Sequence, residues 1–467
     1  MFKIIDARIL DKNAEYFGIE MEKLMDNAGN AVAKETLKLN PKKVLVLAGN
    51  GNNGGDGYTA SISLLKNGVD VHAYKVKEPE SPLCKKKFQI AKENGLKVDE
   101  KLNFDYDVII DAMLGIGITN EPKEPYRSVI ESLNSAGKFV ISVDVPSGFP
   151  TNVSVKPSIT VTMQFIKEGM NETNCGKIIV ADVGFPVEII ESVGPGEFLA
   201  YNKNLPESHK GDNGIILAIG GSHLFYGAPL YMAKAASRMG PDLVFLFAPE
   251  SIHAYLSGFQ DMILRKCGYN FIEFNEEIKH LIEERDVTVS IGPGITKSRE
   301  ALENARKIID FTIKTGRYIV IDADALQAID ENSDLNGQAV ITPHRGEFKQ
   351  TFNLDPSEEN VRYIAKKINA TVLLKGPIDI ISDGEIIKKN KDFHHASMTR
   401  GGTGDILTGS VAGLMSKHID PFHAAALASF IVGMAGKKTF HDKSYSYFTS
   451  EIIDNIPEIF KQFLGNE

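Results

Sequence analysis

The sequence has few of the features that mark secreted or membrane-spanning proteins. Its three cysteines, Cys84, Cys175 and Cys267, are an odd number and lie far apart, which suits neither a disulfide framework nor a zinc site. Residues 1–10 lack the basic region and apolar block of a signal peptide. The most apolar late stretch, residues 424–436, is too short to span a bilayer. We therefore expect a protein of a reducing compartment, the cytoplasm.

Excess positive charge is also missing. The net charge is −9 and the isoelectric point is near 5.8, so no global field favours a nucleic-acid backbone or an anionic membrane. We expect neither as a partner, and a nucleotide ligand would need local binding devices. A length of 467 residues exceeds one ordinary core, and 43% hydrophobic with 24% charged residues is typical of a soluble globular protein.

Short apolar runs alternate with segments of helical period, and each run ends at a Gly- or Asp-containing turn. This alternation predicts βα units and buried parallel sheets, hence an α/β fold. A polar, Gly- and Pro-containing interval, residues 191–213, predicts two domains, 1–200 and 201–467. The expected strands are Val44–Ala48, Val108–Asp111, Phe139–Val143, Ile215–Ile219, Leu243–Phe247, Val287–Ile291, Tyr318–Ile321 and Val372–Leu374.

Three strand ends in the first half carry residues suited to a ligand. The first is the glycine-rich stretch Gly49–Gly57, after which we expect a helix from Tyr58 to Lys66. Glycines allow a ligand to approach the backbone, and the N-terminus of a helix favours an anion. Asp111 and Asp144 end two further strands, at the edge where open α/β sheets bind ligands. The alternatives are a simple tight turn for the glycines and helix caps for the two aspartates.

Four motifs of the first half resemble the NAD(P)H-hydrate epimerase domain, a Rossmann-like three-layer α/β/α fold. They are Leu24–Gly29, Asn52–Gly57, Asp111–Gly117 and Val143–Gly148. The resemblance implies that Asp144 is the acid/base for interconverting the R and S hydrates, and that Asn53, Asp111 and Ser147 bind K⁺. Oxygen ligands suit such a hard cation. The resemblance also implies a dinucleotide site made of Asn52, Asn53, Gly54, Gly55, Asp56, Gly115, Ile116, Gly117, Ile118, Thr119, Asn120, Glu121 and Asp144.

In the second half, the stretch Arg400–Gly409 leads into a segment of helical spacing. Gly402 to Asp405 combines small residues at a helix N-terminus with a carboxylate, as a phosphate site with a nearby base requires. This spacing resembles the anion hole and base of the ribokinase-like superfamily, an α/β/α fold. The alternative is that Thr403 or Asp405 only caps the helix.

Seven further motifs narrow the resemblance to ADP/ATP-dependent NAD(P)H-hydrate dehydratases. In order they are His209–Asp212, Ile219–Ser222, Tyr226–Pro229, Ile291–Gly294, Ile321–Leu326, Thr342–Glu347 and Leu374–Gly376. The resemblance implies that Asp405 is the catalytic base and that Ala228, Gly294, His344 and Asp405 contact the hydrate. It implies a nucleotide site made of Lys375, Gly376, Pro377, Ile378, Asp379, Gly401, Gly402, Thr403 and Gly404. His344 could instead be a surface turn residue.

The resemblance as a whole implies a bifunctional NAD(P)H-hydrate repair enzyme, with ADP rather than ATP as co-substrate, Mg²⁺ with the nucleotide, and a homo-oligomeric state. Its substrates would be hydrated NADH and NADPH. A nucleotide is chemically useful because hydroxide leaves badly: water has a pKa of about 15.7 and a phosphate group one of ~6. At ~1.36 kcal/mol per pKa unit, phosphorylation improves the leaving group by up to roughly 13 kcal/mol.

Two other functions fit parts of the sequence. One is a ribokinase-like kinase for a small alcohol, with the N-terminal half as a nucleotide-binding regulatory domain. That enzyme would leave a stable phosphorylated product instead of a restored dihydropyridine. The other makes the N-terminal half a nucleotide or RNA-binding module, against which the acidic charge balance argues.

Overall fold

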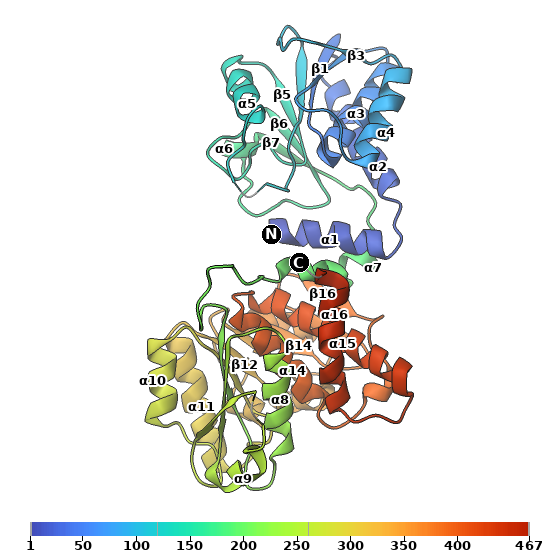
Figure 1. Ribbon diagram of the computed structural model, residues 1–467. Helices are drawn as coiled ribbons and strands as arrows, with labels where there is room; N and C mark the ends of the chain where they lie inside the picture. Colours follow the sequence, from blue (N-terminus) through green and yellow to red (C-terminus); the bar gives the residue numbers. More distant parts are fainter. Residues whose placement is uncertain (1, 119, 260, 466–467) are drawn as a thin grey trace. The chain divides into compact units, whose positions relative to one another are not determined.

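The computed structural model describes residues 2–118, 120–259 and 261–465, and the chain forms two compact units (Figure 1). The first extends to Ile190 and the second begins at Glu191. This boundary precedes the expected one because residues 191–193 pair with a strand of the second unit. Ser192 bridges to Lys389, and the Val193 N–H donates to the Lys389 carbonyl at 3.1 Å.

In the first unit the described residues form a seven-stranded sheet with parallel pairing throughout. Its strands are β1 (Lys43–Ala48), β2 (Asp70–Lys75), β3 (Lys97–Val98), β4 (Val108–Ala112), β5 (Val140–Val143), β6 (Ile159–Met163) and β7 (Lys177–Ala181). Their order across the sheet is β3-β2-β1-β4-β5-β6-β7. The order reverses between β1 and β4, and doubly wound sheets bind ligands at such a switch point.

Helices cover both faces of this sheet, with α2, α3 and α4 packed on one face and α5 on the other (Figure 1). The described helices of this unit are α1 (Ile4–Tyr16), α2 (Met21–Leu37), α3 (Asn52–Lys66), α4 (Pro82–Glu93), α5 (Tyr126–Ser135), α6 (Glu172–Cys175) and α7 (Val187–Ile190). Successive residues of a strand point to opposite faces. Accordingly Val46 of β1 packs in one cluster with Tyr58 of α3, and Leu45 packs in another with Ile130 of α5. The predicted three-layer α/β/α fold is confirmed.

The glycine-rich stretch after β1 differs from the prediction, since α3 begins at Asn52 and not at Tyr58. Gly54, Gly55 and Gly57 therefore lie inside the first turns of this helix. A Cβ on Gly57 would lie 2.5 Å from the Ala112 Cβ, and one on Gly55 would lie 2.8 Å from the Met25 sulfur. These glycines thus allow α3 to pack closely against β4 and α2.

The second unit forms a nine-stranded sheet among its described residues. Its strands are β8 (Ile215–Ile219), β9 (Leu243–Ala248), β10 (Ile263–Lys266), β11 (Thr288–Ile291), β12 (Tyr318–Ile321), β13 (Ala339–Ile341), β14 (Thr371–Leu374), β15 (Asp379–Ser382) and β16 (Ile387–Asn390). The order is β10-β9-β8-β11-β12-β13-β14-β15-β16. The first seven strands are parallel, and β15 and β16 add antiparallel pairs at one edge.

Helices again lie on both faces. They are α8 (Gly227–Ser237), α9 (His253–Leu256), α10 (Glu276–Glu284), α11 (Arg299–Lys314), α12 (Arg345–Phe352), α13 (Glu358–Lys367), α14 (Thr403–Ser416), α15 (Pro421–Lys443) and α16 (Ser450–Leu464), with short 3₁₀ turns η1 (Pro195–Ala200), η2 (Glu250–Ile252), η3 (Ala323–Ala328) and η4 (Ala396–Met398). Ala218 packs with Met232 of α8, and Leu217 packs with Ile308 of α11. Within the described ranges, none of the helices combines the length and apolarity needed to cross a membrane.

All eight predicted strands are present, with ends that differ by at most one residue from the predicted ones. The unpredicted strands are β2, β3, β6, β7, β10, β13, β15 and β16. Most of them lie toward the edges of the two sheets.

Candidate functional sites

The first candidate site is a cavity of about 650 Å³ at the switch point of the first sheet. Its walls come from the residues that follow β1, β4, β5 and β6, together with α1 and α2. Because the carboxyl ends of parallel strands meet at one edge, segments far apart in sequence share this cavity. It is large enough for a substantial part of a small-molecule ligand.

Asp144 and Lys167 form an ion pair on the cavity wall. Lys167 is fully buried, and its Nζ donates to Asp144 Oδ1, to Thr162 Oγ1 at 2.8 Å and to the Met163 carbonyl at 2.9 Å. Asp144 Oδ1 also accepts the Met163 N–H at 3.1 Å. The Asp144 backbone has a φ of 66°, an uncommon conformation for a residue other than glycine. The carboxylate is therefore held firmly at the end of β5.

Two more carboxyl groups line the same cavity, Asp11 of α1 and Asp56 of α3. Burial among the cavity walls and the charge of Asp144 raise the pKa of Asp11 to about 7, against the opposing effect of Lys167. Burial, followed by the charges of Asp144 and Asp11, raises the pKa of Asp56 well above its usual range. The cavity thus contains two acids whose pKa values are raised by burial, and a group such as Asp11 can both donate and accept a proton near neutral pH.

Not all of the predicted dinucleotide site reaches this cavity. Asn52, Asn53, Asp56, Asp144 and the run Gly115, Ile116, Gly117 and Ile118 line it, whereas Gly54 and Gly55 face the packing of α3. Asn120 and Glu121 are exposed and away from the cavity wall. Glu121 pairs with Arg127 at 3.0 Å. Thr119 lies outside the described residues.

The predicted K⁺ ligands differ in accessibility. Asn53 lines the cavity, and its buried Nδ2 has no hydrogen-bond partner within the described part of the chain. Asp111 and Ser147 are fully buried behind the wall, where Asp111 accepts the Ser142 hydroxyl at 2.8 Å and the Ser147 N–H at 2.9 Å. Burial raises the pKa of Asp111 despite these hydrogen bonds. Neither Asp111 nor Asp144 is the N-cap of a described helix.

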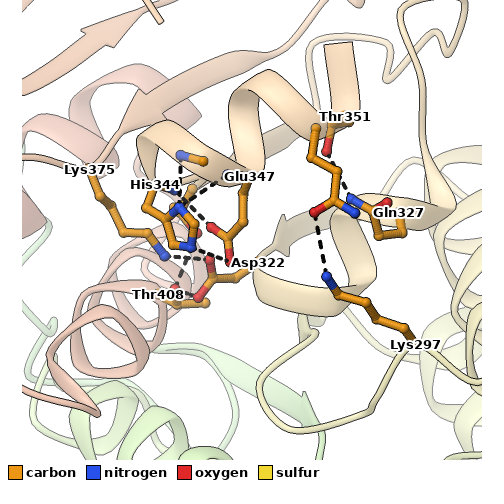
Figure 2. A network of polar contacts seen from close by, with 11 residues as sticks. Lys297, Asp322, Gln327, His344, Glu347, Thr351, Lys375 and Thr408 are labelled. Atoms are coloured by element: carbon orange, nitrogen blue, oxygen red, sulfur yellow. Dashed lines mark hydrogen bonds and ion pairs between the residues drawn. The ribbon is translucent and has the colours of Figure 1, made fainter. Parts of the chain in front are cut away.

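The second candidate site lies where β12, β13 and β14 end and α14 begins. Figure 2 shows Asp322, His344, Glu347, Lys375 and Thr408 pointing toward one another from these segments. Asp322 follows β12 and is fully buried. Its Oδ1 accepts the Lys375 Nζ at 2.6 Å and its Oδ2 accepts the Thr408 hydroxyl at 2.7 Å. One carboxylate therefore ties β14 and α14 to the end of β12.

Asp405 lies in the first turn of α14, near these charges. Burial, with the charges of Asp322 and Glu347, raises its pKa to about 7 against the opposing effect of Lys375. Burial alone would lower the pKa of Lys375, but the charges of Asp322 and Glu347 outweigh it and raise that pKa. A carboxyl that titrates near neutral pH beside a lysine that stays charged is suited to general-base catalysis.

The start of α14 is built to receive an anion. Gly402 is its N-cap, with a φ of 94° and no side-chain cap. The buried Thr403 hydroxyl finds no hydrogen-bond partner among the described residues. A Cβ placed on Gly404 would lie 3.2 Å from the Lys375 Nζ, so this ammonium group faces the first helical turn. Neither Thr403 nor Asp405 caps the helix with its side chain. The Thr403 N–H donates to the Arg400 carbonyl at 3.3 Å, so the N–H groups of Gly404 and Asp405 are those that remain for an anion in the described first turn.

His344 is mostly exposed and is the N-cap of α12. Its Nδ1 accepts the N–H groups of Gly346 and Glu347, both at 3.0 Å, so in the neutral ring Nε2 carries the proton. Glu347 Oε2 in turn accepts the His344 N–H at 2.8 Å. The backbones of His344 and Lys375 also form an isolated parallel β-bridge. The ring is thus fixed beside the site, with its Nε2 3.4 Å from Glu347 Oε1.

The remaining predicted residues occupy two further places. Gly294 adjoins Phe225, which lies three residues before Ala228. A Cβ on Gly292 would lie 1.8 Å from the Asp322 carbonyl oxygen, so the loop that carries Gly292 and Gly294 lies against Asp322. Asp379 is fully buried and holds the turn after β14, where it accepts the Gly376 N–H at 3.1 Å and the Ser429 hydroxyl at 2.7 Å. Gly401, Pro377 and Ile378 are exposed.

Four residues of the two sites had received no role from the sequence: Asp11, Lys167, Asp322 and Glu347. Lys167 follows β6, which was not predicted as a strand, and Asp11 lies on the first helix, far from the motifs. Asp322 and Glu347 lie inside the quoted motifs Ile321–Leu326 and Thr342–Glu347. The position of Asp322 directly after an apolar strand was the available signal.

Comparisons with known proteins match each of the two units to a family. The family model described as NAD(P)H-hydrate dehydratase matches residues 216–458, and the one described as YjeF-related protein N-terminus matches residues 21–169. A ribokinase-like superfamily protein from Enterococcus faecalis superimposes with a TM-score of 0.53, at 20% identity, over 59% of this chain and 97% of its own. An ADP/ATP-dependent NAD(P)H-hydrate dehydratase from Bacillus subtilis gives 0.50, at 22% identity, over 58% and 98%.

These structural matches confirm the ribokinase-like fold of the second unit. One relative matches this chain over nearly its whole length. The bifunctional NAD(P)H-hydrate repair enzyme Nnr of Archaeoglobus fulgidus is 36% identical over 466 residues, 97% of both chains. The chain therefore belongs to the family of bifunctional NAD(P)H-hydrate repair enzymes.

Proposed function

We propose that this enzyme repairs hydrated NADH and NADPH at two sites, an epimerase site in the first unit and a nucleotide-dependent dehydratase site in the second. The observation that carries the proposal is that each unit brings a carboxyl group and a lysine together, Asp144 in an ion pair with Lys167 and Asp405 within the charge field of Lys375. Both pairs follow the carboxyl ends of parallel strands, β5 and β6 in the first unit and β14 in the second. Together the two activities would convert either epimer of the hydrate back to NADH or NADPH.

In the epimerase site, Asp144 would move the proton of the hydrate's hydroxyl group. As it removes this proton, the oxygen forms C=O, the bond from that carbon to the ring nitrogen breaks, and the nitrogen gains a proton. Rotation and reversal of these steps give the other epimer, with no net change in atoms or charge. Lys167 would hold Asp144 in position through its ion pair. Asp11, which lines the same cavity and is half protonated near pH 7, would supply the nitrogen's proton.

The cavity residues support binding of a dinucleotide at this site. Asn52, Asn53, Asp56 and the run Gly115–Ile118 present amide, carboxyl and backbone groups to one space. We propose that these contact the hydrate, whereas Gly54 and Gly55 would contribute only through the packing of α3. Asn120 and Glu121 would reach the ligand only if their loop moved, and for Thr119 the assignment stays a prediction.

K⁺ is the proposed cation of the epimerase site. Asn53, Asp111 and Ser147 offer amide, carboxylate and hydroxyl oxygens, the donors that a hard cation accepts. The Asn53 Oδ1 lies 3.5 Å from a Cβ placed on Gly115, and the Ser147 hydroxyl accepts the N–H of the preceding residue, Leu114, so both oxygens adjoin the loop after β4. The Asn53 Nδ2, which has no partner among the described residues, is a donor and would face an acceptor of the dinucleotide instead of the cation. When bound, K⁺ would supply positive charge that orders the loop after β4 around the dinucleotide.

In the dehydratase site, Asp405 would act as the general base. It would take the proton of the hydrate's hydroxyl while that oxygen bonds to the terminal phosphorus and the phosphorus–oxygen bond to the nucleotide breaks. Elimination then breaks the carbon–oxygen bond, and the departing phosphate takes a proton from the neighbouring carbon as the double bond is restored. Ala228, Gly294 and His344 would contact the hydrate beside Asp405.

The nucleotide would bind at the start of α14 and along the turn after β14. Gly401, Gly402, Thr403 and Gly404 would receive phosphate oxygens, and the turn Lys375–Asp379 would lie along the rest of the nucleotide. Asp379, with both oxygens engaged, would act by holding this turn and not by direct contact. We propose ADP as the co-substrate, by analogy with fused members of the family.

Mg²⁺ is proposed to enter with the nucleotide. Within the described part of the chain no three His, Cys, Asp or Glu side chains are placed to hold a metal, which suits Mg²⁺, since it is commonly bound by substrate phosphates and few carboxylates. When bound, it would neutralise phosphate charge during transfer. A cytoplasmic location and a homo-oligomeric state stay predictions.

The test is to supply the purified enzyme with mixed hydrate epimers and either ADP or ATP. We expect the dihydropyridine absorbance to return for both epimers, with free phosphate as the second product. A stable phosphorylated hydrate in place of the dihydropyridine would indicate the kinase alternative. Separate assays with each nucleotide decide the co-substrate.

A further inference from the structure

Asp322 is placed to organise the dehydratase site without touching a substrate. Its side chain is fully buried, and each carboxylate oxygen already accepts a hydrogen bond, one from Lys375 and one from Thr408. Thr408 also donates toward the Gly404 carbonyl at 3.0 Å and contacts the Thr342 hydroxyl at 3.2 Å. With both oxygens occupied, Asp322 is poorly suited to be a base or a phosphate ligand.

What Asp322 controls is the position of one ammonium group. A lysine side chain is long and flexible, and left unpaired it samples many rotamers. Here Lys375 has only 16% of its side chain exposed, and the ion pair aims its Nζ at the first turn of α14. An ammonium group carries three donor hydrogens, so those not used by Asp322 remain for a ligand.

The surroundings of this ammonium group favour an anion. The N-terminus of α14 has no side-chain cap, and the buried Thr403 hydroxyl is unpartnered among the described residues. The nearby carboxyls of Glu347 and Asp405 are the other charged groups that act on Lys375. A phosphoryl group at the helix start would therefore meet backbone N–H groups, a hydroxyl and the lysine together.

We infer that Asp322 is a positioning residue that fixes the Lys375 ammonium group beside the start of α14, where it binds the phosphoryl group being transferred. The inference rests on the proposed dehydratase function. It gives Lys375 a role distinct from the rest of the turn that follows β14. It also explains why a carboxylate is retained in the core at this point, where a buried charge is costly unless paired.

A double-mutant cycle tests the inference. Asp322→Asn and Lys375→Met are each expected to lower kcat for dehydration about 100-fold, the usual cost of losing one preorganised donor to a transition state. In the Lys375→Met background, Asp322→Asn should change kcat by less than about threefold, because residues that act through one another are not additive. Independent, multiplicative losses would overturn the inference.

Calorimetric titration with AMP, ADP and ATP provides a second readout. The same variants should weaken ADP and ATP binding while the affinity for AMP, which lacks the terminal phosphoryl group, stays within about twofold. Equal loss for all three nucleotides would show that Asp322 only maintains the fold, and would contradict the inference. Because these titrations need no hydrate, they are informative even if the wild-type enzyme fails to dehydrate it, which would refute only the proposed function.

Two further variants guard against misfolding. Thr408→Val removes one hydrogen bond to Asp322 and keeps the ion pair, so it should lower kcat in the wild-type background and have little further effect with Lys375→Met. Equal effects in both backgrounds would contradict the inference. The exposed pair Lys366 and Glu385, 3.1 Å apart, is the matched control, and Lys366→Met with Glu385→Gln should leave kcat unchanged.

Discussion

Replacing Gly404 by alanine should make the enzyme more stable and less active. Gly404 lies in the first turn of α14, and alanine in place of a helical glycine stabilises a protein by about 0.5–1 kcal/mol. In a unit of this size that raises Tm by about 2 °C. The new methyl group would lie 3.2 Å from the Lys375 Nζ and would project toward the anion site. A displaced ammonium group should lower dehydratase kcat by roughly tenfold or more.

The assay compares thermal unfolding with recovery of dihydropyridine absorbance from the S hydrate at saturating nucleotide. Gly258→Ala is the matched control, because nothing lies within 4 Å of a Cβ at that exposed position. It should alter neither kcat nor epimerisation. Wild-type kcat in a correctly folded Gly404→Ala enzyme would refute the placement of the phosphoryl group between Lys375 and α14.

Three other predictions follow from the same geometry. Asp405→Asn should abolish dehydration. The base acts when it is deprotonated, and its pKa is raised to about 7, so rate assays on the wild type should show kcat/KM rising with pH and half-maximal near pH 7. Lys167→Met should slow interconversion of the epimers by roughly tenfold or more, measured by chromatography, with dehydration of the S form unchanged. Gly292→Ala should lower the free energy of unfolding of the second unit by about 2 kcal/mol or more in denaturant titrations, because the φ of Gly292 is 132° and its Cβ would meet the Asp322 carbonyl oxygen at 1.8 Å. An unchanged denaturation midpoint would contradict this prediction.

Most of the central strands could be predicted because they are buried on both faces; β13 is the exception, because its apolar run is only three residues long. Such strands consist of nearly continuous apolar residues, as in β8, where all five residues are buried. Strands toward the edges mix exposed and buried residues, and β10 contains Arg265 and Lys266, so a search for apolar runs misses them. The antiparallel β15 and β16 likewise follow no βα unit that could reveal them.

Site residues could be predicted where a local sequence motif lines the candidate site. They could not be predicted where side chains far apart in the sequence contact one another. Asp144 follows an apolar strand and Asp405 lies in the first turn of a helix, and both positions can be recognised in the sequence. Lys167 and Asp322 act through pairs with residues 23 and 53 positions away, a separation that no local pattern encodes. The glycines of α3 also show a limit of the motif, because a Cβ on Gly54 would meet the Gly49 carbonyl and one on Gly55 would meet Met25, packing demands that the sequence alone does not reveal. Their ligand contacts stay a prediction.

The claim that two separate sites act in turn is tested most directly by following each epimer separately. An equal mixture of R and S hydrates with nucleotide would be resolved by chromatography over time, for the wild type and for Asp144→Asn. We expect the wild type to consume both epimers, and the variant to consume the S form at the wild-type rate while the R form persists. Equal slowing of both epimers in a folded variant would contradict the division of labour between the two units.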